Sequence, residues 1–310
     1  MGKELWKYRI FENTLELFIG NLPTPLVKLS KSSIGRVEVW AKLEFYNPYS
    51  RSIKDRISWA MIKDAYDKGL LKNVIEEASS GNTSLALAAL SRIYNKKFRA
   101  YLPKKVSETV PILLKVFGAE YVTTEYETIG PEFWNYVRKH AEEIGATNLN
   151  QFKNDVNFKM HYETTAKEIV EQMKALKKTP NYVVCGTGTS GHVAAISKRI
   201  KEVFGKTKVY AVQPAKGHSI PGIKRIETKP KWFFQVQIDG LIDVTLRDAV
   251  ESSIEVARKE GILIGLSSGA VYWSFKKLVK EGAEGVFVLV FPDDGFKYVG
   301  FFKKYFEGEI

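Results

Sequence analysis

The sequence predicts an α/β protein in which two units, each built on a parallel or mixed sheet, enclose a cleft. Three observations lead to this fold class. Strand-like and helix-like segments alternate along the chain, polar glycine-containing turns join several strands to the next helix, and 310 residues with 45% hydrophobic side chains allow two sizeable cores. Strands that alternate with helices of this length form parallel sheets covered on both faces.

The first half of the chain shows this alternation in four successive pairs. After Ser50, apolar residues recur at helical spacing as far as Ala65, and Gly69 is placed to end that helix. We expect strands at residues 37–43, 74–78, 98–103 and 120–123, and helices after Ser50 and at residues 85–90, 106–117 and 132–144. A boundary is expected near residues 145–151. It divides the chain into a smaller, mobile domain of residues 44–147 and a larger domain of residues 1–43 plus 148–310.

The second half continues the pattern. We expect strands at residues 181–185, 208–213 and 286–291, and helices at residues 192–204, 247–260 and 270–280. The last strand is rich in β-branched residues and ends at Pro292, which is followed by Asp293 and Asp294.

Composition excludes several classes of protein. The net charge of +12 comes from lysines and arginines scattered among acids, as in residues 198–202, which favours a solvated surface over a nucleic-acid-binding face. No apolar run is long enough to cross a bilayer, and the N-terminus lacks the apolar core of a secretory signal. A single cysteine excludes an internal disulfide framework and is consistent with a cytoplasmic location. Four histidines without paired spacing predict no metal site.

A lysine at the mouth of the first long helix is the first candidate for chemistry. Lys54 follows the turn-forming pair Asn47-Pro48 and falls in the first helical turn, where the positive end of the helix dipole disfavours an ammonium. A neutral lysine amine can form a Schiff base with a carbonyl group. A solvated lysine at a surface helix start is the alternative.

A glycine-rich turn between strand 181–185 and helix 192–204 is the second candidate. Residues 186–191 read Gly-Thr-Gly-Thr-Ser-Gly, which satisfies the spacing of the dinucleotide fingerprint. That interpretation requires an acidic residue at the end of the next strand, where this chain has Gln213. The hydroxyls of Thr187, Thr189 and Ser190 instead suit a terminal phosphate, which the free N–H groups of a helix start bind well.

Three further polar turns precede helices or follow strands. They are residues 79–84 (Ser-Ser-Gly-Asn-Thr-Ser), residues 265–270 (Gly-Leu-Ser-Ser-Gly-Ala) and residues 218–225 (His-Ser-Ile-Pro-Gly-Ile-Lys-Arg). Each alone is explained by ordinary helix capping or a surface loop. Together with Lys54 and the phosphate loop they indicate a cofactor that carries both an aldehyde and a phosphate, and pyridoxal phosphate has both.

With these motifs in order, the chain resembles the cysteine synthase branch of the fold-type-II, tryptophan-synthase-β-like pyridoxal-phosphate enzymes, from residue 23 to residue 298. The resemblance implies two α/β domains with the active site between them, and a homodimer. It implies the following roles: Lys54 as the lysine that binds the cofactor and moves the Cα proton, Asn82 at the ring hydroxyl, Gly186, Thr187, Gly188, Thr189 and Ser190 as the phosphate loop, Ser267 at the pyridine nitrogen, and Ser79, Ser80, Thr83 and Gln151 at the substrate carboxylate.

Departures from the family pattern bear on the substrate. Ser84 stands where the family's loop usually has a second glycine, and two cations, Lys224 and Arg225, stand where small residues are usual. An acetyl leaving group needs no cation, whereas a phosphate would be stabilised by one. The chain therefore resembles the O-phosphoserine sulfhydrylases. We expect Arg225 to bind the phosphate first and Lys224 second, with two solvated loop cations as the alternative.

The expected function is that of a cysteine synthase that joins sulfide to O-phospho-L-serine, or to O-acetyl-L-serine, with pyridoxal 5′-phosphate. A hydroxyl partner such as Ser267 does not hold the pyridine nitrogen protonated, which favours β-elimination and replacement over transamination. Alternatives are a serine or threonine dehydratase, a cystathionine β-synthase, or, outside enzymes, a basic nucleic-acid-binding protein. Cys185 is expected to be a buried structural thiol, and Asp293 and Asp294 receive no role.

Overall fold

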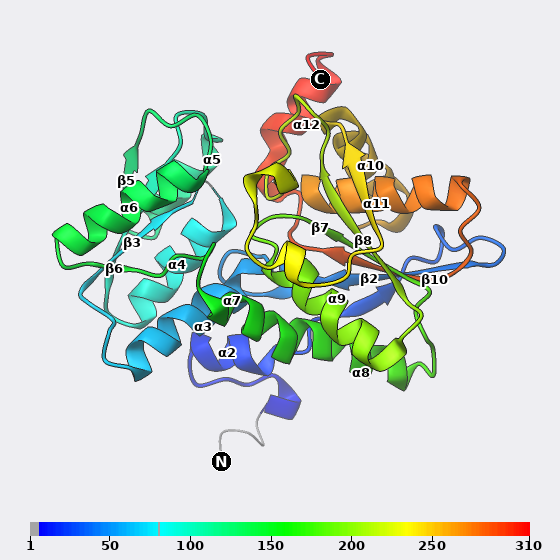
Figure 1. Ribbon diagram of the computed structural model, residues 1–310, viewed down its shortest axis with the longest axis horizontal. Helices are drawn as coiled ribbons and strands as arrows, with labels where there is room; N and C mark the ends of the chain where they lie inside the picture. The colour runs from blue at the N-terminus through cyan, green and yellow to red at the C-terminus, as the bar shows by residue number, and fades with distance from the viewer. Residues whose placement is uncertain (1–5, 80) are drawn as a thin grey trace.

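The computed structural model describes residues 6–79 and 81–310, and these form two sheets (Figure 1). The larger sheet has six strands in the order β1-β2-β10-β7-β8-β9, and the smaller has four in the order β5-β4-β3-β6. All pairs are parallel except β1 with β2. The strands are β1 (Leu26–Lys28), β2 (Val37–Leu43), β3 (Val74–Ala78), β4 (Lys97–Leu102), β5 (Glu120–Thr123), β6 (Thr147–Asn148), β7 (Tyr182–Gly186), β8 (Lys208–Pro214), β9 (Gly240–Val244) and β10 (Gly285–Phe291).

Helices cover both sheets and connect their strands. The α-helices and the π-helical segment η3 are α2 (Thr14–Gly20), α3 (Lys54–Asp67), α4 (Asn82–Ile93), α5 (Thr109–Val116), α6 (Pro131–Glu143), α7 (Asp155–Met160), η3 (His161–Ala166), α8 (Lys167–Ala175), α9 (Gly191–Phe204), α10 (Leu246–Glu260), α11 (Leu266–Lys280) and α12 (Val299–Phe306). Short 3₁₀ turns are η1 (Trp6–Tyr8), η2 (Glu44–Tyr46), η4 (Ile226–Thr228), η5 (Phe233–Gln235) and η6 (Phe296–Tyr298).

The larger sheet is buried on both faces, as its near-continuous apolar strands require. In β10, Phe287, Leu289 and Phe291 belong to the core beneath α10 and α11. Val288 and Val290 alternate with them and belong to the core beneath α8 and α9. The two helix pairs lie on opposite sides of the sheet in Figure 1. The two-residue period of the strand therefore places one apolar set on each face.

The smaller sheet has the same three-layer arrangement. One core joins α3, α4 and α5 to the sheet through residues such as Ile57, Leu87 and Phe98. The other joins α6 to the opposite face through Phe133, Val137 and neighbouring residues. All four strands of this sheet lie between residues 74 and 148.

The sequence predictions differ from the structure in several elements, and α2, β1, β6 and α12 are among those not predicted. The helical stretch from α7 through α8 was not predicted, because α7 is short and a π-helical segment separates it from α8. Strand β9 was not predicted either, and it is partly exposed. Helix α11 begins at Leu266 and not at Ala270, so Ser267 lies inside its first turn. The α/β class and the two sheets are confirmed.

A buried ion network lies below the start of α3. The fully buried guanidinium of Arg56 donates two hydrogen bonds to Glu44, at 2.7 and 2.9 Å, and two to Glu168, at 2.6 and 2.7 Å. Lys42 in β2 donates to Glu168 at 2.7 Å, and Thr24 donates to Glu44 at 2.7 Å. Because the two glutamates come from η2 and α8, the network joins the helix that begins with Lys54 to the larger sheet and its covering helix.

Among the described residues, no helix has the length and apolar character needed to cross a membrane. The same residues hold no group of three or more histidine, cysteine or acidic side chains placed to bind a metal ion.

Candidate active site

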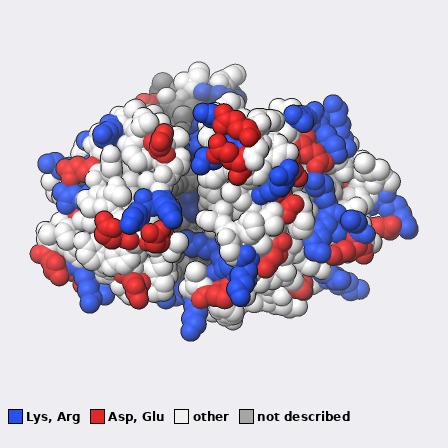
Figure 2. Space-filling view, turned by 90° about the horizontal axis from the view of Figure 1, so that it is seen from above, with Lys and Arg blue, Asp and Glu red and all other residues white. Residues whose placement is uncertain are grey.

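The predicted site residues converge because their loops follow the carboxyl ends of parallel strands. In the larger sheet, β2, β7, β8 and β10 run parallel and open toward the same edge. Polar loops at that edge of an α/β sheet form its binding crevice. In the smaller sheet, β3 leads to residues 79–82 and β6 leads to Gln151. The space-filling view shows a groove between the two lobes, with lysine and arginine side chains along it (Figure 2).

Lys54 is the first residue of α3 and so lies in its first turn, where the sequence placed it. Its helix start is held by the N–H of Ile53, which donates to the carbonyl of Pro292 at 2.8 Å. Its side-chain amine has no hydrogen-bond partner among the described residues. Burial lowers the pKa of Lys54 to about 8, against the charges of Asp293 and Glu44, which raise it. A substantial fraction of the amine is therefore neutral near pH 8, the form that attacks a carbonyl.

Three of the four residues predicted at the substrate carboxylate lie together at the end of β3. Thr83 donates to the side-chain oxygen of Gln151 at 2.8 Å, and both are buried. The hydroxyl of Ser79 accepts the N–H of Ser84 at 3.2 Å, so it caps the start of α4. Ser80 lies outside the described residues. The structure thus offers hydroxyl, amide and helix-start N–H groups suited to a carboxylate.

The predicted phosphate loop lies at the N-terminus of α9. Ser190 precedes that helix with φ of 69°, in the left-handed region. The two glycines pack closely against the loop after β8: an added Cβ on Gly188 would lie 2.9 Å from the carbonyl oxygen of Gly222, and one on Gly186 would lie 2.6 Å from Ile223. The hydroxyl of Thr187 bonds to main-chain carbonyls, at 2.8 Å from Val212 and 2.7 Å from Lys224, and so fixes the loop.

Asn157 in α7 joins the phosphate loop to the carboxylate site, and no local sequence pattern singles it out. Its buried amide nitrogen donates to the carbonyl of Gln151 at 2.8 Å and to the hydroxyl of Thr189 at 3.1 Å. Its amide oxygen is buried without a partner among the described residues. The two loops are therefore tied through one side chain.

Ser267 faces the same space from the first turn of α11. It is almost fully buried, and its hydroxyl has no partner among the described residues. A Cβ placed on Gly222 would lie 3.5 Å from that hydroxyl, which puts Ser267 next to the loop that packs on Gly188.

Asn82 and Asp293 form a contact that the sequence analysis missed. Asn82, at the start of α4, donates to Asp293 at 2.8 Å, and the buried hydroxyl of Tyr298 donates to the same carboxylate at 2.5 Å. The position of Asp293, directly after the last strand of a parallel sheet, was the available signal.

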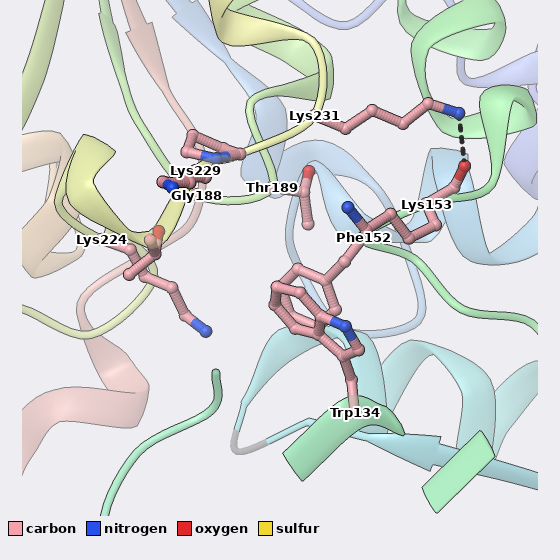
Figure 3. Close-up of a pocket in the computed structure, with 10 residues that line it drawn as sticks. Trp134, Phe152, Lys153, Gly188, Thr189, Lys224, Lys229 and Lys231 are labelled. Carbon is pink, nitrogen blue, oxygen red and sulfur yellow. Dashed lines mark hydrogen bonds between the residues drawn. The ribbon is translucent and has the colours of Figure 1, made fainter. Parts of the chain in front are cut away.

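Of the two predicted phosphate-binding cations, only Lys224 faces the pocket. Figure 3 shows its side chain directed toward Trp134 and Phe152, in a pocket also lined by Gly188, Thr189, Lys153, Lys229 and Lys231. The guanidinium of Arg225 is instead held by Glu227 at 2.8 Å, Asp243 at 3.1 Å and the carbonyl of Pro214 at 2.7 Å. Two acidic residues, Glu227 in η4 and Asp243 in β9, thus engage Arg225, and of the two predicted cations Lys224 is the one directed into the pocket.

These residues fit pyridoxal phosphate. The free amine of Lys54 and the free hydroxyl of Ser267 are partly or fully buried groups that need a partner. The phosphate loop leads into the N-terminus of α9, whose free N–H groups suit an anion. His192, in the first turn of α9, has a buried ring nitrogen without a partner among the described residues. Burial and the charge of Lys54 lower the pKa of His192 to about 3, so its ring is neutral at physiological pH.

Comparison with known proteins agrees with this fit. The family described as pyridoxal-phosphate dependent enzyme matches residues 17–293. The chain is 36% identical to the cysteine synthase of Aquifex aeolicus (strain VF5) over 96% of this chain and 94% of that protein. It is 33% identical to cysteine synthase B of Escherichia coli (strain K12) over 93% of this chain and 94% of that protein.

Solved structures give the same result. The crystal structure of O-ureido-L-serine synthase matches with a TM-score of 0.84 and 29% identity, over 91% of this chain and 92% of that one. A hydrogen sulfide-producing enzyme from Fusobacterium nucleatum matches with a TM-score of 0.81 and 32% identity, over 93% of this chain and 98% of that one. The chain therefore belongs to the pyridoxal-phosphate-dependent enzymes, in their fold-type-II group. Within that group it is a cysteine synthase-like enzyme.

Proposed function

We propose that the protein is a cysteine synthase that replaces the β-substituent of an activated L-serine with sulfide, with O-phospho-L-serine as the favoured donor. O-Acetyl-L-serine is the other donor to test. The observation that supports the choice of donor is Lys224, a partly buried lysine beside the phosphate loop without an acidic partner among the described residues.

Lys224 is suited to an incoming dianion. Its amine donates to the carbonyl of Ile129 and lies 4.8 Å from the ring centroid of Phe152. Burial lowers the pKa of Lys224 to about 7. A bound phosphate would raise that pKa again, because a nearby anion favours the protonated amine.

Three further lysines increase the positive potential at the same pocket. Lys153, Lys229 and Lys231 line it, and only Lys231 has a carboxylate partner among the described residues, Asp155 at 2.7 Å. Clefts lined by charges of one sign concentrate ligands of the opposite sign. A neutral acetyl group would not benefit from this field.

The roles of the side chains follow from their positions. When bound, the cofactor withdraws electrons from the substrate Cα, so that its proton becomes acidic and a β-substituent can leave. Lys54 removes the Cα proton and later returns it. Ser79, Thr83 and Gln151, with Ser80, hold the substrate carboxylate. Asn82 and Ser267 orient the ring, and residues 186–190 hold the cofactor phosphate.

In the replacement step, Lys224 protonates or shields the departing phosphate, and sulfide then forms the new bond at Cβ.

Closure is proposed for the smaller domain, residues 44–147, which carries the loop from Ser79 to Thr83. Closing the cleft over the substrate carboxylate would exclude water from the replacement step.

The donor is tested by steady-state rates with both donors. Lys224→Ala should lower kcat/KM for O-phosphoserine by about 10- to 100-fold, the loss expected for one hydrogen bond to a charged group. The same variant should change kcat/KM for O-acetylserine less than threefold, and Arg225→Ala, the matched control, should change neither donor strongly. Equal losses for both donors would refute the assignment. The cofactor absorbance near ~410–420 nm, measured in the same samples, shows whether Lys224 holds the cofactor instead.

A second candidate is elimination or replacement with another partner, as in a serine or threonine dehydratase or a cystathionine β-synthase. The structural likeness to O-ureido-L-serine synthase and to a hydrogen sulfide-producing enzyme supports this candidate, because those proteins are named for other reactions. Assays for pyruvate, 2-oxobutanoate and cysteine, with sulfide present, separate these activities. Loss of the cofactor band in Lys54→Ala would exclude a basic nucleic-acid-binding protein.

We also propose a homodimer in the cytoplasm. The assembly is proposed from the family alone, and the location from a chain with a single cysteine. Sedimentation of the purified protein tests the assembly.

A further inference from the structure

The turn after β10 touches the starts of three helices that carry cofactor residues. Ile53, next to Lys54, donates its N–H to the carbonyl of Pro292 at 2.8 Å. Gly265, at the N-cap of α11, donates its N–H to the carbonyl of Asp293 at 3.0 Å. Asn82, the first residue of α4, donates its side-chain amide to the carboxylate of Asp293 at 2.8 Å. One turn thus contacts the helices of Lys54, Ser267 and Asn82.

Main chain and side chain have separate roles in this turn. The contacts to α3 and α11 use the carbonyl groups of Pro292 and Asp293, so they remain when the side chain at 293 changes. The carboxylate of Asp293 contacts Asn82 and Tyr298, and its second oxygen is buried without a partner among the described residues. The side chain can therefore be altered without removing the main-chain framework.

We propose that Asp293 is a positioning residue for the cofactor: its carboxylate fixes the orientation of the Asn82 amide toward the ring and places a negative charge beside Lys54. The proposal rests on the cofactor of the family and not on the choice of donor.

The hydrogen-bond chemistry fixes the amide in one orientation. An ionised carboxylate only accepts, so the nitrogen of Asn82, and not its oxygen, must face Asp293. That nitrogen keeps one further N–H for the ring hydroxyl of the cofactor. Tyr298 donates to the same carboxylate, and burial together with the charge of Asp293 raises the pKa of Tyr298, which keeps its hydroxyl protonated.

The charge of Asp293 also acts on its neighbours. Among the charges that favour the ammonium form of Lys54, that of Asp293 contributes most. The amine of Lys297 lies 3.9 Å from the carboxylate and is the other cation that faces it. Close packing holds the carboxylate in place, since a Cβ on Gly265 would lie only 2.0 Å from its unpartnered oxygen.

The test compares Asp293→Asn with Asp294→Asn. Asp294 is the adjacent carboxylate, which pairs with Arg51 at 2.5 Å and has no contact with Asn82 among the described residues. Each apoprotein is titrated with pyridoxal phosphate, and the dissociation constant and the pH dependence of the band near ~410–420 nm are measured. Asp293→Asn should weaken cofactor binding about tenfold or more and shift the pH transition of the band to lower pH, because a cationic lysine–cofactor linkage loses its anionic neighbour. Asp294→Asn should change the dissociation constant less than twofold.

A double-mutant comparison separates positioning from general damage to the fold. If Asp293 acts through Asn82, the loss of cofactor affinity in the double variant with Asn82→Ala should be smaller than the sum of the two single losses. Circular dichroism of each apoprotein checks folding, and Tyr298→Phe, which removes one donor to the same carboxylate, serves if Asp293→Asn does not fold. Wild-type affinity and an unshifted pH transition in the Asp293 variant, or fully additive losses in the double variant, would overturn the proposal. Neither result depends on which donor the enzyme uses.

Discussion

Replacing Arg56 with methionine tests the buried network that fixes the helix of Lys54. Methionine is unbranched and apolar, so it can fill part of the buried space of Arg56 but cannot donate hydrogen bonds to Glu44 or Glu168. Each of these glutamates accepts two hydrogen bonds from Arg56. After the substitution, Lys42 is the only cation among the described residues that still bonds to either glutamate, and it bonds to Glu168. Within the same residues, the fully buried Glu44 keeps only its neutral donors Thr24 and Asn47.

The expected loss follows from the unpaired charge. Removing one partner of a buried ion pair costs about 3–5 kcal/mol because the remaining charge stays buried. We expect Arg56→Met to lower the free energy of unfolding by about that amount. Arg138→Met is the control, since its exposed pair with Glu142, at 2.5 Å on one helix face, contributes about 0–1 kcal/mol.

The assay is urea unfolding of the apoproteins followed by circular dichroism at several pH values. Burial raises the pKa of Glu168, but the charges and hydrogen bonds of Arg56 and Lys42 outweigh it and lower that pKa to about 2. The stability that Glu168 contributes is therefore present above its ordinary pKa and is lost as the pH falls toward 2. This acid-sensitive part should shrink in Arg56→Met. A variant within 1 kcal/mol of the wild type, or with the same acid sensitivity, would refute the reasoning.

Three further predictions concern other parts of the site. Gly188→Ala should weaken cofactor binding at least tenfold, measured by titration of the apoprotein, because the added Cβ would lie 2.9 Å from the carbonyl of Gly222; unchanged affinity would contradict the close packing. Burial raises the pKa of Glu77 to about 8, so its cost to folding grows as the pH rises from its ordinary pKa toward 8. Glu77→Gln should therefore gain stability relative to the wild type over that range in urea unfolding, and a constant difference would contradict it. The rate at which apoprotein binds pyridoxal phosphate should rise with pH and level off above about 8, the pKa of Lys54, and a flat profile would show that its neutral amine is not limiting.

The sequence predicted the sheets and the loops well because their signals are local. Strands 37–43 and 74–78 match β2 and β3 residue for residue, since each contains β-branched residues and lies beside polar turns. The spacing of its apolar face likewise predicted a helix after Ser50, and α3 begins at Lys54. Loops that follow parallel strands must meet at one edge, so their convergence followed from the fold class.

The contacts that join distant segments could not be predicted from local patterns. Arg225 was preferred to Lys224 for its bidentate geometry, but Asp243, eighteen positions later, holds its guanidinium in the folded chain. Asn157 lies in a helix whose periodicity is interrupted by a π-helical turn, so neither the helix nor its bridging amide was expected. In each case the sequence does not show which of several polar side chains finds a partner far away in the chain.

The single thiol gives the protein a built-in reporter of global opening. Cys185 lies in the central strand β7, fully enclosed between the sheet and the helices α8 and α9, and burial raises its pKa. A protonated, enclosed thiol does not react with alkylating reagents, because the thiolate is the nucleophile and the reagent must reach it. Alkylation would occur only when the sheet separates from its helices, and its rate would measure that separation under native conditions without any denaturant.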